Sequence, residues 1–154
     1  ANQFDPSVTW KDAEWMMSEW GGPFVLKGIM SVDDAKKAVE IGASAIVISN
    51  HGGRQLDSSP APFDVLSDIV DAVGGQVEII LDGGIRRGTH LLKAIALGAN
   101  ACMIGRPYLY GLAAGGQPGV ARALSLLRTE IELDMKLMGC RNLSEVTSAC
   151  LRKR

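Results

Sequence analysis

Four short apolar runs, spaced along the chain, are the clearest pattern in the sequence. They cover residues 24–26, 45–48, 77–81 and 101–104, and most of them are apolar without interruption. A strand with one wet face alternates apolar and polar residues, whereas a parallel strand buried on both faces does not. The four runs therefore predict a parallel sheet of an α/β fold, with helices in the connections between the strands.

Segments with helical periodicity fill these connections and flank them. The helices predicted between the strands begin or end with a capping signal and span about 31–42, 62–73 and 89–98. Upstream, the spacing Thr9-x-x-Asp12 predicts the start of a helix that ends before Gly21. Downstream, the apolar positions from Val120 to Met138 predict a long helix, and Asn142-x-x-Glu145 predicts a short one.

An internal repeat favours one of the two architectures that this alternation allows. Three pairs of positions recur 56 residues apart, namely Gly28-Ile29 with Gly84-Ile85, Gly42-Ala43 with Gly98-Ala99, and Ser49 with Gly105. The period is two strand–helix units, as expected if a piece of a barrel was duplicated. We therefore expect part of a (β/α)8 barrel, a TIM barrel, in one domain over residues 1–154. An open doubly wound sheet is the alternative.

Composition and charge exclude several classes of protein. With 16 basic and 17 acidic residues, the net charge of -1 gives no sign of binding to nucleic acid or to an anionic membrane. No apolar run approaches the roughly 20 residues that a transmembrane helix needs, and no secretory signal is recognisable, so we expect a cytoplasmic location. Three cysteines without C-x-x-C spacing predict neither a disulfide framework nor a metal site.

Polar and glycine residues stand at the end of each predicted strand. Lys27 ends the first, Ser49-Asn50-His51 follow the second, Asp82-Gly83-Gly84 the third, and Gly105-Arg106 the fourth. In a βα barrel the carboxyl ends of the strands gather at one face, and phosphate commonly binds after the last two strands. We therefore expect these segments to form one site.

Two of the segments are candidates for binding a phosphate group. They comprise Asp82, Gly83, Gly84, Ile85 and Arg86 in one cluster, and Gly105 and Arg106 in the other. Small residues expose backbone N–H groups, and arginine supplies a bidentate cation. Two tight turns with surface arginines are the alternative, but the occurrence of both motifs at consecutive strand ends favours phosphate binding.

The segment from Ser49 to Asp57 carries the most specific candidate chemistry. It places an imidazole, His51, and a guanidinium, Arg54, three residues apart in a glycine-rich loop. Histidine is the usual general base near neutral pH, and arginine binds a carboxylate through two parallel hydrogen bonds. His51 is therefore predicted as a catalytic base and Arg54 as a substrate-binding residue, whereas His90, near a helix start, is predicted to lie on the surface.

Lys27 has two interpretations. An ammonium group at the end of an apolar strand is costly to bury unless it is paired with negative charge, so a structural ion pair is the first. In a barrel mouth that also binds phosphate, the ammonium could instead stabilise negative charge that develops on a reduced cofactor ring. The sequence alone leaves both open.

Taken together, these segments resemble the FMN-dependent 2-hydroxy-acid oxidases and dehydrogenases. The resemblance covers nearly the whole chain, and the histidine-containing segment is its most diagnostic motif. It rests on Val25-Leu26-Lys27-Gly28, Ser49-Asn50-His51-Gly52-Gly53-Arg54-Gln55-Leu56-Asp57, Asp82-Gly83-Gly84-Ile85-Arg86-Arg87-Gly88 and Ile104-Gly105-Arg106-Pro107. The resemblance implies that the chain supplies the last four units of the barrel and its C-terminal helices.

The resemblance also implies a cofactor and a role for each residue. FMN is expected, with Lys27 and Ser49 beside the flavin ring. The phosphate and ribityl chain of FMN would be bound by the two clusters, which comprise Asp82, Gly83, Gly84, Ile85, Arg86, Gly105 and Arg106. His51 would accept a proton and Arg54 would bind the substrate carboxylate. The implied reaction oxidises an L-2-hydroxy acid to a 2-oxo acid while FMN is reduced.

Several features of this reaction stay open. His51 could take its proton from the α-carbon, or from the hydroxyl group while hydride passes to the flavin. The electron acceptor is also undecided, and glycolate, L-lactate and mandelate-like acids are all candidate substrates.

A complete barrel has eight units, so we expect the N-terminal half to come from elsewhere. It would be supplied separately or by a second copy, and the complete enzyme would be a homo-oligomer. By the resemblance, that half carries tyrosines that contact the substrate and an aspartate that orients His51. The alternative function is a non-catalytic FMN- or phosphate-binding half barrel that self-associates.

Overall fold

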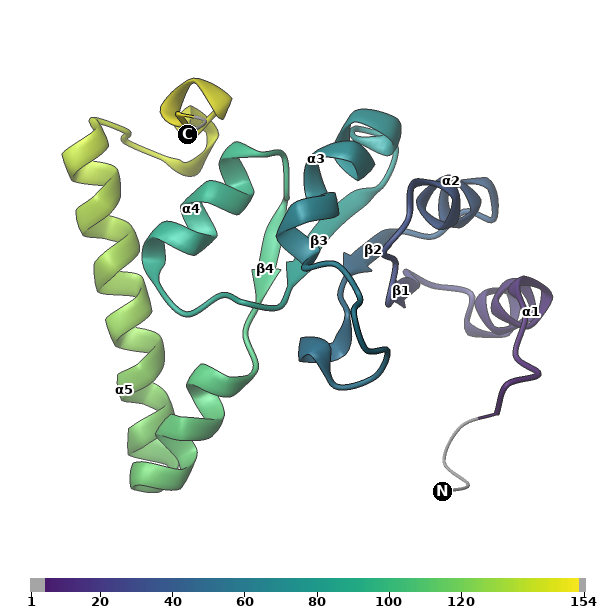
Figure 1. The fold of residues 1–154 in the computed structure, drawn as a ribbon, viewed down its shortest axis with the longest axis horizontal. Helices are drawn as coiled ribbons and strands as arrows, with labels where there is room; N and C mark the ends of the chain where they lie inside the picture. Colours follow the sequence, from purple (N-terminus) through teal and green to yellow (C-terminus); the bar gives the residue numbers. More distant parts are fainter. Residues whose placement is uncertain (1–4, 153–154) are drawn as a thin grey trace.

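The computed structural model describes residues 5–152, and its centre is a parallel sheet with the strand order β1-β2-β3-β4 (Figure 1). The strands are β1 (Val25–Lys27), β2 (Ala45–Ile48), β3 (Glu78–Asp82) and β4 (Ala101–Met103). They are joined by α2 (Val32–Glu40), α3 (Pro62–Val73) and α4 (Gly88–Ala96). A doubly wound sheet reverses its strand order at a switch point, and this order has no reversal. The part-barrel architecture is therefore confirmed, while residues 1–4 and 153–154 of the expected domain lie outside the described part.

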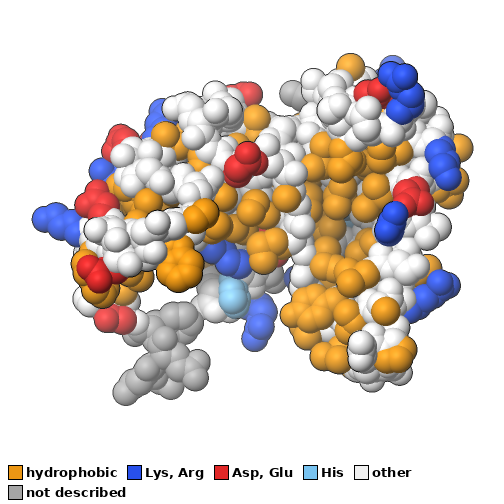
Figure 2. Space-filling model, turned by 180° about the vertical axis from the view of Figure 1, so that it is seen from behind, with side chains coloured by type: hydrophobic (Ala, Val, Ile, Leu, Met, Phe, Trp, Pro, Cys, Tyr) orange, Lys and Arg blue, Asp and Glu red, His pale blue; other side chains and the backbone are white. Residues whose placement is uncertain are grey.

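The two faces of the sheet differ in what covers them. Ile46, Ile48 and Leu81 are completely buried against the helices. Alternate residues point to the opposite face, where Val25 is 48% exposed and Met103 is 42% exposed. Figure 2 shows apolar side chains gathered on this hollowed side of the molecule. In a complete (β/α)8 barrel the corresponding face is part of the packed interior.

The strand register brings the candidate residues to one edge of the sheet. Lys27 pairs with Val47, and Asp82 pairs with Met103. Ile48, the last residue of β2, pairs with Leu81, the residue before Asp82. The carboxyl ends of all four strands therefore lie side by side, as the sequence predicts.

The internal repeat is visible in the backbone. The helices α2 and α4 each have nine residues and end in the same way, with glycines of positive φ, Gly42 at 84° and Gly98 at 103°. The amide of Ala43 donates to the carbonyl of Ala38 at 3.0 Å, and the amide of Ala99 donates to that of Ala94 at the same distance. The repeat is therefore confirmed as two copies of one helix-to-strand turn.

The helix α5 (Arg106–Met138) is longer than the sequence predicts because it begins before the kink at Gly115 and Gly116. Non-helical backbone angles at these two glycines divide it into two parts. The parts lie close together, since a Cβ added at Gly111 would lie 2.6 Å from the carbonyl oxygen of Gly119. The first part is short and contains Gly111, a residue that is unfavourable within a helix, so the apolar pattern predicts the second part alone.

The other flanking segments follow the sequence closely. The helix α1 (Trp10–Trp20) begins with the predicted capping box between Thr9 and Asp12. The predicted short helix after Asn142 is a single 3-10 turn, η2 (Leu143–Glu145), and a second turn, η3 (Ser148–Cys150), was not predicted. Among residues 5–152 there is no helix with the length and apolarity required to cross a membrane.

All three cysteines are free thiols in the structure. Cys102 on β4 packs against the core beneath the helices, and burial raises the pKa of its thiol to about 11. Since the thiolate is the reactive form, Cys102 is a packing residue at neutral pH.

We predict that Gly98→Ala destabilises the fold more than the control Gly75→Ala. Both glycines have positive φ, +103° and +78°, so an alanine is strained at either position. A Cβ at Gly98 would also lie 2.5 Å from Cγ1 of Val70, whereas nothing lies within 4 Å of a Cβ at Gly75. Urea unfolding should show a loss of about 1 kcal/mol for Gly75→Ala and about 3 kcal/mol for Gly98→Ala. Equal losses would contradict the close packing of this turn on α3.

Candidate active site

Three strand ends are joined by a hydrogen-bonded group of Lys27, Ser49 and Asp82, which we call the strand-end triad. Nζ of Lys27 donates to Oγ of Ser49 at 2.7 Å and to Oδ2 of Asp82 at 2.6 Å. Oγ of Ser49 donates to the same carboxylate oxygen at 2.7 Å. Because the three residues belong to the ends of β1, β2 and β3, the triad ties consecutive strands together where the site begins.

The triad fixes the charges of its members. Burial raises the pKa of Asp82, but hydrogen bonds from Lys27 and Ser49 and the charge of Lys27 outweigh burial and hold the pKa below its usual range. Asp82 is therefore a carboxylate at neutral pH and balances the charge of Lys27. This is the structural ion pair that the sequence offers as one interpretation of Lys27. The Lys27 side chain is nevertheless 41% exposed and lines a cavity, so its ammonium stays accessible to a ligand.

The loop after β2 turns sharply because three consecutive residues have positive φ. The values are 56° for His51, 72° for Gly52 and 74° for Gly53. Glycine adopts this conformation freely, but histidine does so only where its surroundings hold it. The backbone N–H of His51 donates to Oγ of Ser49 at 3.1 Å, so the triad also fixes the start of this loop.

Two further side chains hold the loop in place. Oδ1 of Asn50 accepts a hydrogen bond from the N–H of Gly53 at 3.0 Å, and its Nδ2 donates to the carbonyl of Pro60 at 3.1 Å. Nη2 of Arg106, at the start of α5, donates to the carbonyl of Gly52 at 3.2 Å. The loop after β2 is therefore tied to the end of β4, although the two are far apart in the sequence.

A glycine-rich group, which we call the cradle, comprises residues 83–86 and 105–106. A Cβ added at Gly84 or Gly105 would meet no atom within 4 Å, so a ligand can approach the backbone closely at both positions. Arg86 and Arg106 are exposed and line the same cavity. The side chain of Ile85 is 3% exposed and packs in the core, so Ile85 offers a ligand its backbone alone.

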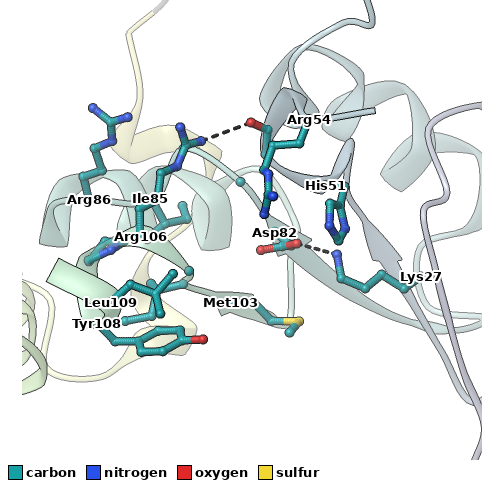
Figure 3. Close-up of a pocket in the computed structure, with 16 residues that line it drawn as sticks. Lys27, His51, Arg54, Asp82, Ile85, Arg86, Met103, Arg106, Tyr108 and Leu109 are labelled. Carbon is teal, nitrogen blue, oxygen red and sulfur yellow. Dashed lines mark hydrogen bonds and ion pairs between the residues drawn. The ribbon is translucent and has the colours of Figure 1, made fainter. Parts of the chain in front are cut away.

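Lys27 and Asp82 of the triad, the loop after β2 and the cradle line one open cavity of about 340 Å³. Figure 3 shows Lys27, His51 and Arg54 on one side of it, and Arg86 and Arg106 on the other. Met103, Tyr108 and Leu109 supply an apolar wall. The cavity therefore offers an imidazole, several cations and an apolar surface to one ligand. No cluster of metal-ligating side chains occurs in the part of the chain that the structure describes.

The structure brings all the predicted site residues to this cavity except Ser49, which is 3% exposed and lies beneath it. The sequence groups Asp82 with the phosphate-binding residues, but its carboxylate lies in the triad, and a carboxylate would repel a phosphate.

Asn50 and Tyr108 were not predicted as site residues. Asn50 precedes two glycines, a signal for a capped turn, whereas a tyrosine two residues after Arg106 fits packing equally well.

These features describe part of a barrel in which a glycine-rich, arginine-lined cavity lies beside a histidine. Comparison with known proteins makes the class specific. Residues 1–153 match the family model described as FMN-dependent dehydrogenase. The chain belongs to this family.

Individual relatives are similar over nearly the whole chain. L-lactate oxidase from Nostoc sp. is 54% identical over 151 residues, which are 98% of this chain and 41% of the relative. Pre-mycofactocin synthase from Mycobacterium tuberculosis is 58% identical over 134 residues, which are 87% of this chain and 33% of the relative. A crystal structure of mandelate oxidase is 47% identical, with a TM-score of 0.90, over 96% of this chain and 44% of that one. The chain thus spans less than half the length of each relative.

We predict that Asp82→Asn makes the stability of the protein less sensitive to acid. The pKa of Asp82 in the folded state lies below its unfolded value of about 3.9. Asp82 therefore stabilises the fold above about pH 4, and this contribution is lost as the pH falls through the lower pKa of the folded state. Urea unfolding between pH 6 and pH 3 should show a steeper loss of stability for the wild type than for Asp82→Asn.

The matched control for this experiment is Asp71→Asn, which changes an exposed carboxylate on α3. It should keep the pH dependence of the wild type. If Asp82→Asn also keeps that dependence, the triad does not hold Asp82 in its charged form.

Proposed function

We propose that this chain is the C-terminal half of an FMN-dependent enzyme that oxidises an L-2-hydroxy acid to a 2-oxo acid. The observation that carries the proposal is that His51 and Arg54 face the same cavity as the cradle. This reaction needs a general base, a cation for the carboxylate and a site for the phosphate of the cofactor. The family and the names of the relatives support the proposal.

The residues present fit FMN. Gly84 and Gly105 leave the backbone open to a phosphate ester, and Arg86 and Arg106 supply positive charge beside it. The exposed ammonium of Lys27, at the other side of the cavity, would lie beside the flavin ring. A solved mandelate oxidase variant that is 48% identical to this chain holds an FMN adduct. When bound, FMN accepts the two electrons that are removed from the α-carbon of the substrate.

The chain itself supplies the groups that bind and deprotonate the substrate. Arg54 would bind the substrate carboxylate through a bidentate pair and so place the 2-hydroxy carbon near His51. His51 accepts a proton from the substrate, whether that proton leaves the carbon or the hydroxyl group. As the carbon–hydrogen and oxygen–hydrogen bonds break and the carbonyl of the 2-oxo acid forms, the substrate loses two electrons and two protons. One proton goes to His51, and the electrons and the other proton would go to FMN. Lys27 would offset negative charge on the reduced flavin.

The proposal includes the missing units of the barrel as a second half. Val25 on β1 and Met103 on β4 are exposed at the two edges of the sheet, and a barrel closes when such edges are paired. Within residues 5–152 the imidazole ring of His51 has no hydrogen-bond partner, so a group on the other half would orient it. That half would come from the same polypeptide or a separate one, and a second copy of this chain is the alternative. A homo-oligomeric enzyme and a cytoplasmic location remain predictions from the sequence.

The substrate is proposed as a class. The relatives are named for L-lactate, for mandelate and for pre-mycofactocin, at 54%, 47% and 58% identity. These values do not separate one substrate from another. His51 and Arg54 act on the hydroxyl carbon and the carboxylate, which every L-2-hydroxy acid has, and so they support the class.

We predict that His51→Gln slows the reduction of bound FMN by about 10²- to 10⁴-fold, the usual contribution of a general base. Glutamine keeps the size of the side chain but cannot accept the proton. Stopped-flow flavin absorbance with an L-2-hydroxy acid, under anaerobic conditions, measures the rate.

Arg54→Lys should instead raise KM, because lysine cannot form the bidentate pair.

The absorbance of bound FMN in each variant is the control for cofactor binding, and it should match that of the wild type. Reduction of His51→Gln at the wild-type rate would rule out His51 as the base.

A further inference from the structure

His90 lies in the first turn of α4, directly beside the cradle. It is partly exposed, and its ring contacts the backbone of the cradle. Its Nδ1 lies 3.2 Å from the backbone nitrogen of Arg86 and 3.1 Å from the backbone oxygen of Gly84. Both neighbours belong to the cradle, and the proposed reaction uses neither contact.

One ring nitrogen cannot satisfy both neighbours at the same time. Without a proton, Nδ1 has a lone pair and accepts the hydrogen bond from the N–H of Arg86. With a proton, Nδ1 donates to the carbonyl of Gly84 and has no lone pair left for Arg86. When the ring is doubly protonated, the N–H of Arg86 therefore loses its partner.

We propose that His90 is a positioning residue of the cradle and couples proton uptake to tighter binding of the FMN phosphate. The inference rests on the proposed function, since it assumes that the cradle binds this phosphate. Neutral His90 with its proton on Nε2 accepts the hydrogen bond from the N–H of Arg86. Imidazolium releases that N–H for the phosphate and adds a positive charge beside it, and both changes favour an anion.

The charged groups around His90 lie on three elements. They are Arg86 and Arg87 on the loop before α4, Lys93 on α4 and Glu130 on α5. A backbone N–H at the start of α4 and the side chain of Arg87 hydrogen-bond to Glu130 and lower its pKa, so this carboxylate stays ionised near neutral pH. Of these groups, the imidazole is the one whose contact atom accepts a hydrogen bond without a proton and donates one with a proton.

The test compares FMN binding by the intact protein and by His90→Asn. The amide oxygen of asparagine can accept the hydrogen bond from Arg86 but cannot take up a proton, so the variant imitates neutral His90. Flavin fluorescence gives the Kd at pH 8 and at pH 5.5. The phosphate of FMN itself titrates at about pH 6, but equally for both proteins, so the ratio of the two Kd values isolates His90.

We expect equal Kd values at pH 8 and about threefold tighter binding by the wild type at pH 5.5, the size of a partly exposed charge interaction. Riboflavin, which lacks the phosphate, should show no such change in the ratio. Thr89→Ala, a change at the exposed neighbouring position, should behave as the wild type. His90→Gln serves as the second variant, and urea unfolding shows whether each variant is folded.

The inference would be overturned if the ratio of the Kd values of the two proteins for FMN did not depend on pH. It would also be overturned if the ratio for riboflavin changed with pH in the same way. Either result would leave the proposed function intact. Failure of the wild type to bind FMN at either pH would instead refute the proposed function.

Discussion

The hydrogen-bonded group of Lys27, Ser49 and Asp82 is the interaction on which the site depends. A lysine at the end of a short apolar strand is tolerated there because a carboxylate two strands away balances its charge. The hydroxyl of Ser49 accepts a hydrogen bond from Lys27 and donates one to Asp82. It also accepts a hydrogen bond from the backbone N–H of His51. One small group therefore sets the spacing of three strand ends and the start of the loop that carries His51.

This arrangement explains how one cavity offers different chemistry at its two sides. Asp82 neutralises Lys27 locally and leads directly into the glycines of the cradle, while the arginines at the far side keep their charge for an anion. The hydrogen bond from Arg106 to the carbonyl of Gly52 connects the cradle to the loop that carries His51, although the two belong to different βα units.

The sequence predicts most of the fold because its signals are local. Buried parallel strands appear as unbroken apolar runs, and α1 and α2 begin at recognisable caps. The first part of α5 is missed because it is short and its Gly111 serves a close approach to Gly119 in the second part, a tertiary contact that no local pattern encodes. The rule that strand ends gather at one edge predicts the site, but side-chain direction requires the structure. Asp82 and Ser49 point into the triad, Ile85 points into the core, and the contacts of His90 with Gly84 and Arg86 depend on the shape of a turn.

The central claim is that the cavity binds FMN and positions an L-2-hydroxy acid for oxidation. Its most direct test is the absorbance spectrum of the intact protein, containing the whole barrel and loaded with FMN, during anaerobic addition of glycolate, L-lactate or L-mandelate. The account predicts that the bound FMN is bleached by at least one of these acids and that one equivalent of 2-oxo acid forms per flavin. FMN that binds in the cavity but keeps its oxidised spectrum with every one of these acids would contradict it.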